Sequence, residues 1–492
     1  MKRDKNKKGE KMKSSGVKKN FAYQMIYEVF VLLLPFLTSP YIARVIGANG
    51  LGLYSYSHTV ANYFVLFAML GLKNHGNRVI AKSRDNKDEL NKAFSNLLAI
   101  HLIVSALVCV AYIAYVVFFA EDKIYAIIQS GLVLSGLFDI SWFYFGIEKF
   151  KLTVTRNTII KILTVICVFA FVRNRDDLWI YCTIMSVGML VSQLALWVPL
   201  KRYVTLVKPQ WNQMTPHIKP MLILFIPTIA VSLYKYMDKI MIGSMNTKVQ
   251  LGYYENAEKV INILMTVITS FGTVMLPKMS NLAAKKSKEV LRYINMSMDF
   301  INCLAFGLAF GLAGVGTVFS VVFWGDEFAT SGYIIMGLAA TVPFIAFANV
   351  IRTQHLIPNS RDKEYVSSVC IGGLLNLIIN FILIPRFGAM GAMIGTVAAE
   401  ASVCIIQAFV VRRDLPISKY LKDCLFYFIF GAVMFATVYL IGYFMGTGIL
   451  TLLVQIPTGA VIYIVLCFLY MRHTNNSALE NVTSNLKAKL KK

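Results

Sequence analysis

Long apolar stretches alternate with short polar connections along almost the whole chain. Fourteen of these stretches are long enough for a helix to cross a hydrocarbon core of ~30 Å, which takes about 20 residues. Their side chains are continuously apolar and show no alternation of period two, so they predict helices and exclude the strands of a closed β-barrel. The predicted spans lie near residues 21–46, 51–72, 94–118, 124–147, 154–172, 179–200, 220–243, 251–277, 293–322, 331–351, 365–385, 388–411, 421–443 and 449–471.

The composition is that of a membrane protein. Hydrophobic residues make up 57% of the 492 positions and charged residues only 15%. A soluble protein of this length would carry more charge on its surface. We therefore predict an all-α polytopic membrane protein with about 14 transmembrane helices.

The positive charges follow the connections in a regular order. Of the 49 Lys and Arg residues, 40 lie in the two tails and in the connections that follow every second helix, whereas five lie in the alternate connections. Because cationic loops are retained in the cytoplasm, both termini are predicted to be cytoplasmic and the number of spans even. The net charge of +24 is explained by topology and contact with anionic lipid, so it does not predict nucleic-acid binding.

Arg156, Lys161 and Lys422 lie toward the predicted cytoplasmic ends of their spans and are counted with the connections, which leaves four cations inside the spans. A buried cation costs at least ~2.5–3.5 kcal/mol in a membrane helix, so each of them requires a reason. One interpretation is a cavity that binds an anionic head group through Arg44, Lys235, Lys239 and Lys259. In the other, Arg44 and Lys239 extend to the outer interface, and the remaining two lysines pair with Asp238, Glu255 or Glu258.

Carboxylates inside spans are a second class of candidate, because a buried acid can bind a proton or sodium ion. The candidate coupling or cavity acids are Glu28, Asp139, Asp238, Glu255, Glu258 and Glu400. The eight cysteines and six histidines show no metal-ligand spacing, and no phosphate loop or catalytic motif is present. We therefore expect no metal, no cofactor beyond a possible coupled H⁺ or Na⁺, and no enzyme activity.

The chain repeats part of its sequence at an offset of 200 residues. The repeated positions are Leu51, Gly52, Tyr54, Val60 and Asn62, which recur as Leu251, Gly252, Tyr254, Val260 and Asn262. An even number of spans in each repeat predicts two parallel six-helix bundles related by a pseudo-two-fold axis along the membrane normal, with two further C-terminal helices. The predicted parts are a basic tail (1–19), two bundles (20–218 and 219–413), helices 13 and 14 (414–472) and a second basic tail (473–492).

The most specific pattern lies where predicted helices 11 and 12 join. It runs from Asn376 and Asn380 through Ile384-Pro385, Gly388 and Gly391-Ala392 to Thr396 and Glu400. Pro385 and Gly388 predict a tight external turn, and the small residues after it allow close helix packing. This pattern, the segment from Tyr41 to Gly47 followed by Gly52-Leu53-Tyr54, and the segment 78–81 resemble Wzx-type polysaccharide flippases of the multidrug/oligosaccharidyl-lipid/polysaccharide exporter superfamily. The resemblance spans most of residues 20–412 and includes the count of fourteen helices.

The resemblance implies a flippase in a bacterial plasma membrane that works by alternating access. Its substrate would be a polyprenyl-pyrophosphate-linked oligosaccharide, turned from the cytoplasmic to the outer face, with polysaccharide polymerase and glycosyltransferases as possible partners. Cations in a cleft between the bundles would neutralise the pyrophosphate. Two alternatives stay open: a flippase for a peptidoglycan or teichoic-acid precursor, and a cation-coupled multidrug antiporter, which the surplus of intramembrane acids favours.

Overall fold

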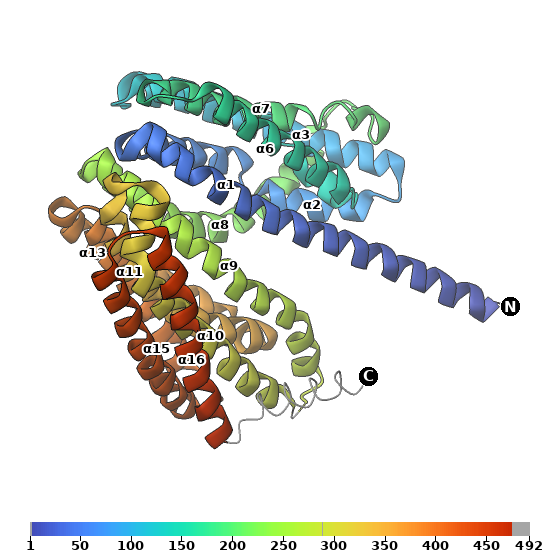
Figure 1. Cartoon of the computed structure of the whole chain (residues 1–492). Coiled ribbons are helices and arrows are strands. Elements are labelled where there is room, and N and C mark those ends of the chain that lie inside the picture. The colour runs from blue at the N-terminus through green and yellow to red at the C-terminus, as the bar shows by residue number, and fades with distance from the viewer. Residues whose placement is uncertain (1, 288, 475–492) are drawn as a thin grey trace. The chain divides into compact units, whose positions relative to one another are not determined.

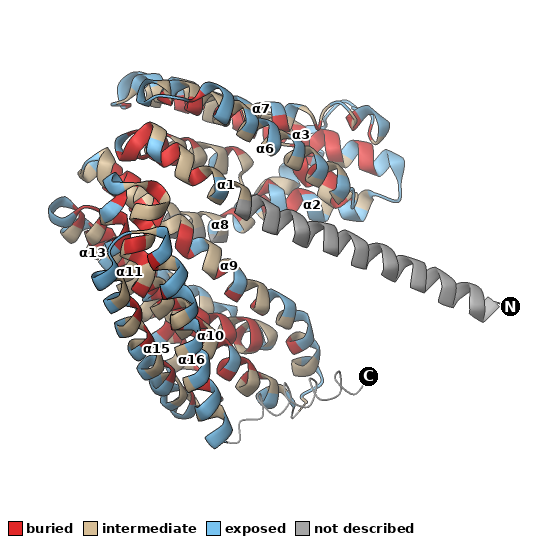
Figure 2. Cartoon of the chain, in the orientation of Figure 1, coloured by how far each residue is buried: buried red, intermediate tan, exposed pale blue. Residues whose placement is uncertain are grey.

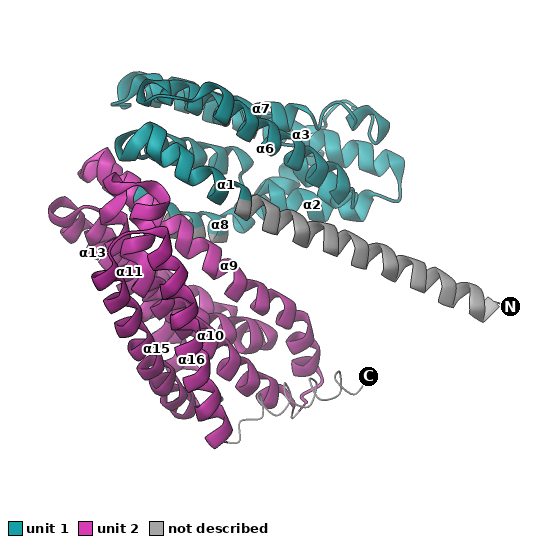
Figure 3. Cartoon of the chain, in the orientation of Figure 1, with its two compact units in different colours: residues 1–240 teal, residues 241–492 magenta. Residues whose placement is uncertain are grey.

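The computed structural model describes the backbone of residues 2–287 and 289–474, without the side chains of 1–33, 35, 227, 230, 231 and 233–235. In this part of the chain the regular structure is helical, as the sequence predicts (Figure 1). The chain divides into two compact units, residues 1–240 and 241–492 (Figure 3). Within each unit, buried residues face neighbouring helices and many large apolar side chains are exposed, as expected for a surface in contact with lipid (Figure 2).

The first unit is built around the second half of α1, which packs against α3, α4, α6 and α7. Its helices are α1 (Lys2–Met69), α2 (Leu72–Ser83), α3 (Lys87–Phe118), α4 (Lys123–Leu137), α5 (Ser141–Gly146), α6 (Phe150–Phe171), α7 (Leu178–Leu194) and most of α8 (Trp211–Met245). The Asn86 side chain caps α3 by accepting hydrogen bonds from the Asp88 and Glu89 amides. An aromatic core of Phe94, Trp142 and Phe143 joins α3 to α5.

The second unit is centred on α10, which contacts α11, α12, α15 and α16. Its helices are α9 (Lys248–Ala284), α10 (Glu289–Trp324), α11 (Ala329–Ala339), α12 (Thr341–Ile351), α13 (Asp362–Phe387), α14 (Ala389–Val410), α15 (Ile417–Met445) and α16 (Ile449–His473). The predicted helices 13 and 14 are α15 and α16, and a cluster around Tyr427, Met434 and Tyr463 packs them against α10.

The helices reproduce the predicted order of spans. Eleven helical segments of the described residues are long and apolar enough to cross a membrane, and they correspond one to one with eleven of the predicted spans. The other three predicted spans, 21–46, 51–72 and 220–243, lie in α1 and α8. The prediction of an all-helical polytopic membrane protein is therefore confirmed.

Several predicted spans are bent or interrupted. The first two are continuous in α1 except at Gly47, whose φ of 75° and ψ of 177° form a kink that glycine adopts without strain. The fourth span divides into α4 and α5 at Phe138–Ile140, and the tenth into α11 and α12. The tenth then ends in a π-helical turn, Arg352–Leu356, which the apolar pattern does not predict.

Candidate functional site

The candidate cations of the first unit lie near the predicted outer ends of its helices. Arg44 is exposed, one turn before the kink at Gly47, and Lys239 is half-buried on α8. The neighbouring Asp238 is buried, with 6% of its surface exposed. Lys235 is on α8, but its side chain lies outside the described residues. Their role in binding an anionic head group stays a prediction.

Lys259 of the second unit forms an ion pair within its own helix. Its Nζ lies 3.3 Å from Oε1 of Glu255, one turn earlier on α9, with 35% of the lysine and 13% of the glutamate side chain exposed. This is the pairing that the sequence offered as an alternative to a free cation. A paired lysine is less costly in a membrane than an isolated one, and its partly exposed ammonium still has hydrogen-bond donors for a second anion.

The candidate acids fall into different surroundings. Glu258 on α9 and Glu400 on α14 are half-buried, whereas the side chain of Glu28 lies outside the described part of α1. Asp139 lies in the break between α4 and α5, where its Oδ1 accepts a hydrogen bond of 2.8 Å from the Ser141 amide. Asp139 therefore has a local structural role. Its role in ion coupling stays a prediction.

The pattern between helices 11 and 12 forms a tightly packed helix pair, α13 and α14. Asn380 donates a hydrogen bond of 3.1 Å to the Asn376 side chain, so these buried amides contact each other along α13. A Cβ on Gly395 would collide with Asn380 Oδ1, and one on Gly391 would lie 2.6 Å from the Leu383 carbonyl carbon. Glycine is therefore required for the close approach of the two helices.

The segment around the end of α8 and the start of α9 is hydrogen-bonded to this helix pair, at the end of the second unit that is predicted to face outward. Asn246 donates a hydrogen bond of 2.9 Å to the Ile384 carbonyl, and the Gln250 side chain accepts one of 3.1 Å from the Ala389 amide. One turn deeper, the Tyr254 hydroxyl lies 3.1 Å from Thr396 Oγ1. Thr396 of the family-like pattern is thus bonded to the repeated segment.

The first unit contains equivalent contacts between equivalent helices. The Tyr41 hydroxyl donates a hydrogen bond of 2.6 Å to the Val172 carbonyl at the end of α6. The ring of Tyr54, the counterpart of Tyr254, packs against Tyr181 of α7 with centroids 4.8 Å apart. In each unit the second span therefore contacts the sixth through the repeated tyrosine, which is what a true internal repeat requires.

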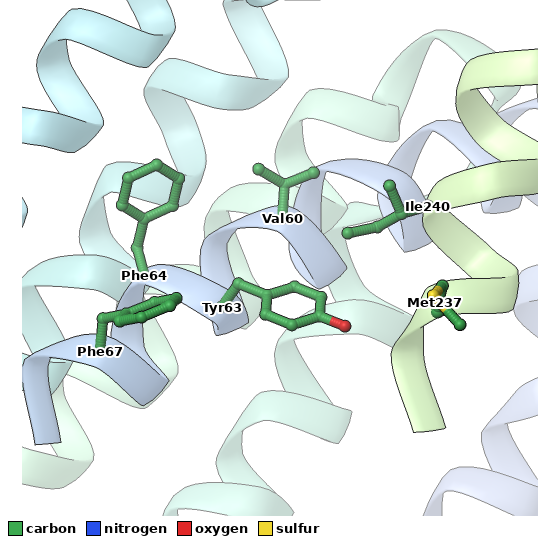
Figure 4. Close-up of a pocket in the computed structure, with 6 residues that line it drawn as sticks. All are labelled: Val60, Tyr63, Phe64, Phe67, Met237 and Ile240. Atoms are coloured by element: carbon green, nitrogen blue, oxygen red, sulfur yellow. The ribbon is translucent and has the colours of Figure 1, made fainter. Parts of the chain in front are cut away.

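An apolar pocket of about 310 Å³ lies in the first unit between α1 and α8. Its lining comprises Val60, Tyr63, Phe64, Phe67, Met237 and Ile240 (Figure 4). Tyr63 extends from α1 toward α8, where its hydroxyl donates a hydrogen bond of 3.2 Å to the Ser232 carbonyl. The described residues of its lining are uncharged, so this part of the pocket suits an apolar chain.

Two histidine environments could not be predicted from the sequence, because the residues that create them are far apart in the chain. His75 on α2 and His217 near the start of α8 share a hydrogen bond of 3.0 Å between Nε2 and Nδ1. Burial lowers the pKa of both imidazoles; for His75, the nearby His217 and Arg78 add to the effect and the pKa falls to about 4. The second environment is that of His101 on α3, which is buried with 1% of its surface exposed.

Among the described residues, no three His, Cys, Asp or Glu side chains come together in a group that could hold a metal ion.

The chain resembles other proteins in sequence over most of its length. A protein of Shigella dysenteriae named as an O-antigen transporter is 22% identical over 402 residues, covering 80% of this chain and 100% of the relative. The capsular polysaccharide biosynthesis protein CapF of Staphylococcus aureus is also 22% identical, over 80% of this chain and 98% of its own.

A solved structure of the lipid II flippase MurJ in an inward closed conformation shares the fold. It matches with a TM-score of 0.75 at 15% identity, covering 93% of this chain and all of the other. An inward-facing multidrug resistance MATE family transporter matches with a TM-score of 0.56 at 13% identity over 80% of this chain. Residues 17–283, more than half of the chain, match the family described as polysaccharide biosynthesis protein, and the chain belongs to that family.

Proposed function

We propose that this protein is a flippase that moves a polyprenyl-pyrophosphate-linked oligosaccharide from the cytoplasmic to the outer face of a bacterial plasma membrane. The observation that carries the proposal is the family membership, together with an O-antigen transporter that aligns over its entire length. The fold similarity to a lipid II flippase supports a lipid-linked cargo.

The chemistry of the cargo explains the residues proposed to bind it. A hydrated diphosphate cannot enter hydrocarbon without compensating charge, and Arg44, Lys235, Lys239 and Lys259 are the candidate cations for this role. In the absence of cargo, Lys259 would remain paired with Glu255. The diphosphate would then compete with the Glu255 carboxylate for the Lys259 ammonium. The apolar pocket beside Tyr63 would accommodate part of an isoprenoid chain.

Coupling to H⁺ or Na⁺ is part of the proposal, with Glu28, Asp139, Asp238, Glu255, Glu258 and Glu400 as the candidate acids. A polymerase and glycosyltransferases are the proposed partners, because they would consume and supply the cargo. The charge distribution supports cytoplasmic termini.

Complementation tests the cargo. The protein is expressed in a strain that lacks its own O-antigen repeat-unit flippase and, in parallel, in one depleted of its lipid II flippase. Restored surface polysaccharide in the first strain without rescue of the second supports the proposal. Rescue of the second alone would assign the protein to a peptidoglycan precursor, the candidate favoured by the fold similarity to MurJ.

The remaining alternative is a multidrug antiporter. The fold is also similar to that of a multidrug resistance MATE family transporter. Resistance to cationic dyes, gained without any surface polysaccharide, would replace the proposed function with this one.

A further inference from the structure

The segment between α7 and α8 is hydrogen-bonded along its backbone to α3. We call residues 204–214, which include the first turn of α8, the α7–α8 strap. Three backbone amides of the strap donate hydrogen bonds of 2.9, 3.0 and 2.9 Å to side chains of α3 that are buried. The pairs are Thr205 with Asn91 Oδ1, Val207 with Ser95 Oγ, and Gln210 with Asn96 Oδ1. Amides of an irregular segment thus have partners in the first unit and do not depend on water.

Both ends of the α7–α8 strap are fixed in the core of the first unit. Val204 is 4% and Met214 5% exposed, and both belong to the apolar cluster around Trp142. Beside Met214, the Gln213 side chain accepts a hydrogen bond of 3.0 Å from Asn96 Nδ2. The strap is therefore held in one position, and the side chains that it exposes are a constant feature of the fold.

The exposed side chains of the strap include large apolar ones. Leu206 is 59%, Val207 36% and Trp211 65% exposed. Val198, in the turn that leads to the strap, is 83% exposed. A single exposed apolar residue is ordinary on a protein surface, but four on one short, fixed segment favour contact with an apolar phase.

The same stretch of chain is strongly basic. It has no Asp or Glu from residue 178 to residue 237. Its exposed cations are Lys201, Arg202, Lys208 and Lys219. None of these four forms an ion pair with a carboxylate of the described residues. Exposed cations beside exposed apolar side chains complement a surface that is both anionic and apolar.

The position of the strap relative to the spans corresponds to the membrane surface. Its partners on α3 flank residue 94, where a span is predicted to begin, and the span within α8 is predicted to begin at residue 220. The strap therefore lies at head-group depth on the side predicted to be cytoplasmic. Tryptophan, lysine and arginine are the residue types that anchor proteins at this depth, which favours lipid over a soluble protein as the partner.

We propose that the α7–α8 strap is a docking surface for anionic phospholipids of the cytoplasmic leaflet. Leu206 and Trp211 insert at the level of the upper acyl chains. Lys201, Arg202 and Lys208 bind the head-group phosphates. Held by α3 on one side and by lipid on the other, the strap fixes the start of α8, the helix that continues into the second unit. This lipid contact is independent of the cargo that the protein moves.

The first experiment locates Trp211 with phospholipids brominated on their acyl chains, because bromine quenches only tryptophans that it contacts. The purified protein is placed in nanodiscs of phosphatidylcholine and phosphatidylglycerol, and the Trp211 signal is the difference between the wild type and Trp211→Phe. We expect strong quenching by lipid brominated near the head-group end of its chains and little quenching by iodide in water. Quenching of Trp211 by iodide and not by lipid would overturn the proposal. Protection from both quenchers only in nanodiscs with two copies would overturn it in favour of a second copy as the partner.

The second experiment tests the charge of the partner. Brominated phosphatidylglycerol and brominated phosphatidylcholine are compared at equal mole fraction. We expect the anionic lipid to quench Trp211 several-fold more strongly, and this preference to be lost in the triple variant Lys201→Gln, Arg202→Gln, Lys208→Gln. It should also be lost at ~1 M salt, where the Debye length is only ~3 Å. Equal quenching by the two lipids in the wild type, or an unchanged preference in the triple variant, would overturn the proposal.

A control variant removes the same charge elsewhere. Lys285→Gln, Lys286→Gln and Arg292→Gln change three exposed cations around the connection of α9 to α10. We expect this variant to keep the wild-type preference for phosphatidylglycerol at Trp211. Loss of the preference in the control as well would assign it to the overall charge of the protein and overturn a specific role of the strap.

Discussion

Lys259 and Glu255 show how a cation can be placed inside a membrane helix. Their charged atoms lie 3.3 Å apart. Residues at i and i+4 lie on the same face of a helix, so helix geometry alone brings the two side chains together. The spacing of the two residues made this pairing predictable. For Arg44 and Lys239 the sequence predicts a position near the outer ends of their spans. The structure places Arg44 shortly before the kink at Gly47 and Lys239 in the last two turns of α8.

Neutralising Lys259 tests its predicted contact with the diphosphate. Loss of one charge-assisted hydrogen bond costs about 1.5–3 kcal/mol, so we expect Lys259→Gln to raise KM for a diphosphate-linked lipid roughly ten- to hundredfold. Glu255→Gln removes the competing carboxylate and should lower KM or leave it unchanged. Equal KM values in the wild type and Lys259→Gln would remove this lysine from the proposed site.

The His75–His217 contact should make the protein sensitive to acid. Burial lowers the pKa of His75 to about 4, below its value of ~6.5 in an unfolded chain. Between these values the unfolded state binds more protons than the folded state, so stability should be present above about pH 6.5 and be lost as the pH falls toward 4. Thermal unfolding in detergent across this range measures the effect.

The variant His75→Asn should flatten this pH profile, whereas His473→Asn should leave it unchanged. An identical pH dependence of melting in the wild type and His75→Asn would show that the contact does not contribute.

At the level of elements, regular spans were predictable and their interruptions were not. Twenty apolar residues require a helix in lipid regardless of their tertiary contacts, which is why the predicted spans correspond to helices. The break at residues 138–140 and the π-helical turn at Arg352–Leu356 contain neither proline nor glycine. The break is held by a partner remote in the chain, because Trp197 donates a hydrogen bond to the Phe138 carbonyl.

The packing of α13 against α14 depends on the absence of a side chain at Gly395. A Cβ there would meet Asn380 Oδ1, so we expect Gly395→Ala to destabilise the protein by about 1–3 kcal/mol through overpacking. Gly311→Ala is the matched control, because its Cβ would lie an ordinary 3.7 Å from Met434 Cε. Melting temperatures in detergent compare the two, and equal values would contradict the account of this helix pair.

At the level of the whole molecule, two units carry matching contacts. Tyr54 against Tyr181 and Tyr254 against Thr396 join the second span to the sixth in each unit. These contacts are consistent with the repeat that the five matching positions predict, and the two equivalent six-helix bundles stay a prediction. The symmetry axis between the units, and with it the substrate cleft, stays a prediction, because neither is specified by contacts within one unit.

The charge distribution makes a prediction about topology. Both termini should lie in the cytoplasm, because 40 of the 49 cations are in the tails and in the connections on one side. A fluorescent protein fused after Lys492 should fluoresce, and alkaline phosphatase at the same point should be inactive. The opposite pattern would invert the topology and contradict the assignment of outer and cytoplasmic ends.

The most direct test of the proposed function is movement of a lipid-linked sugar by the purified protein. Proteoliposomes are loaded with a fluorescent polyprenyl-diphosphate disaccharide, and an impermeant quencher reports the fraction on the outer leaflet over time. We predict exchange between leaflets well above that of protein-free vesicles, and a much slower exchange for the same lipid without its diphosphate. Exchange no faster than in empty vesicles, together with uptake of a cationic dye, would contradict the account.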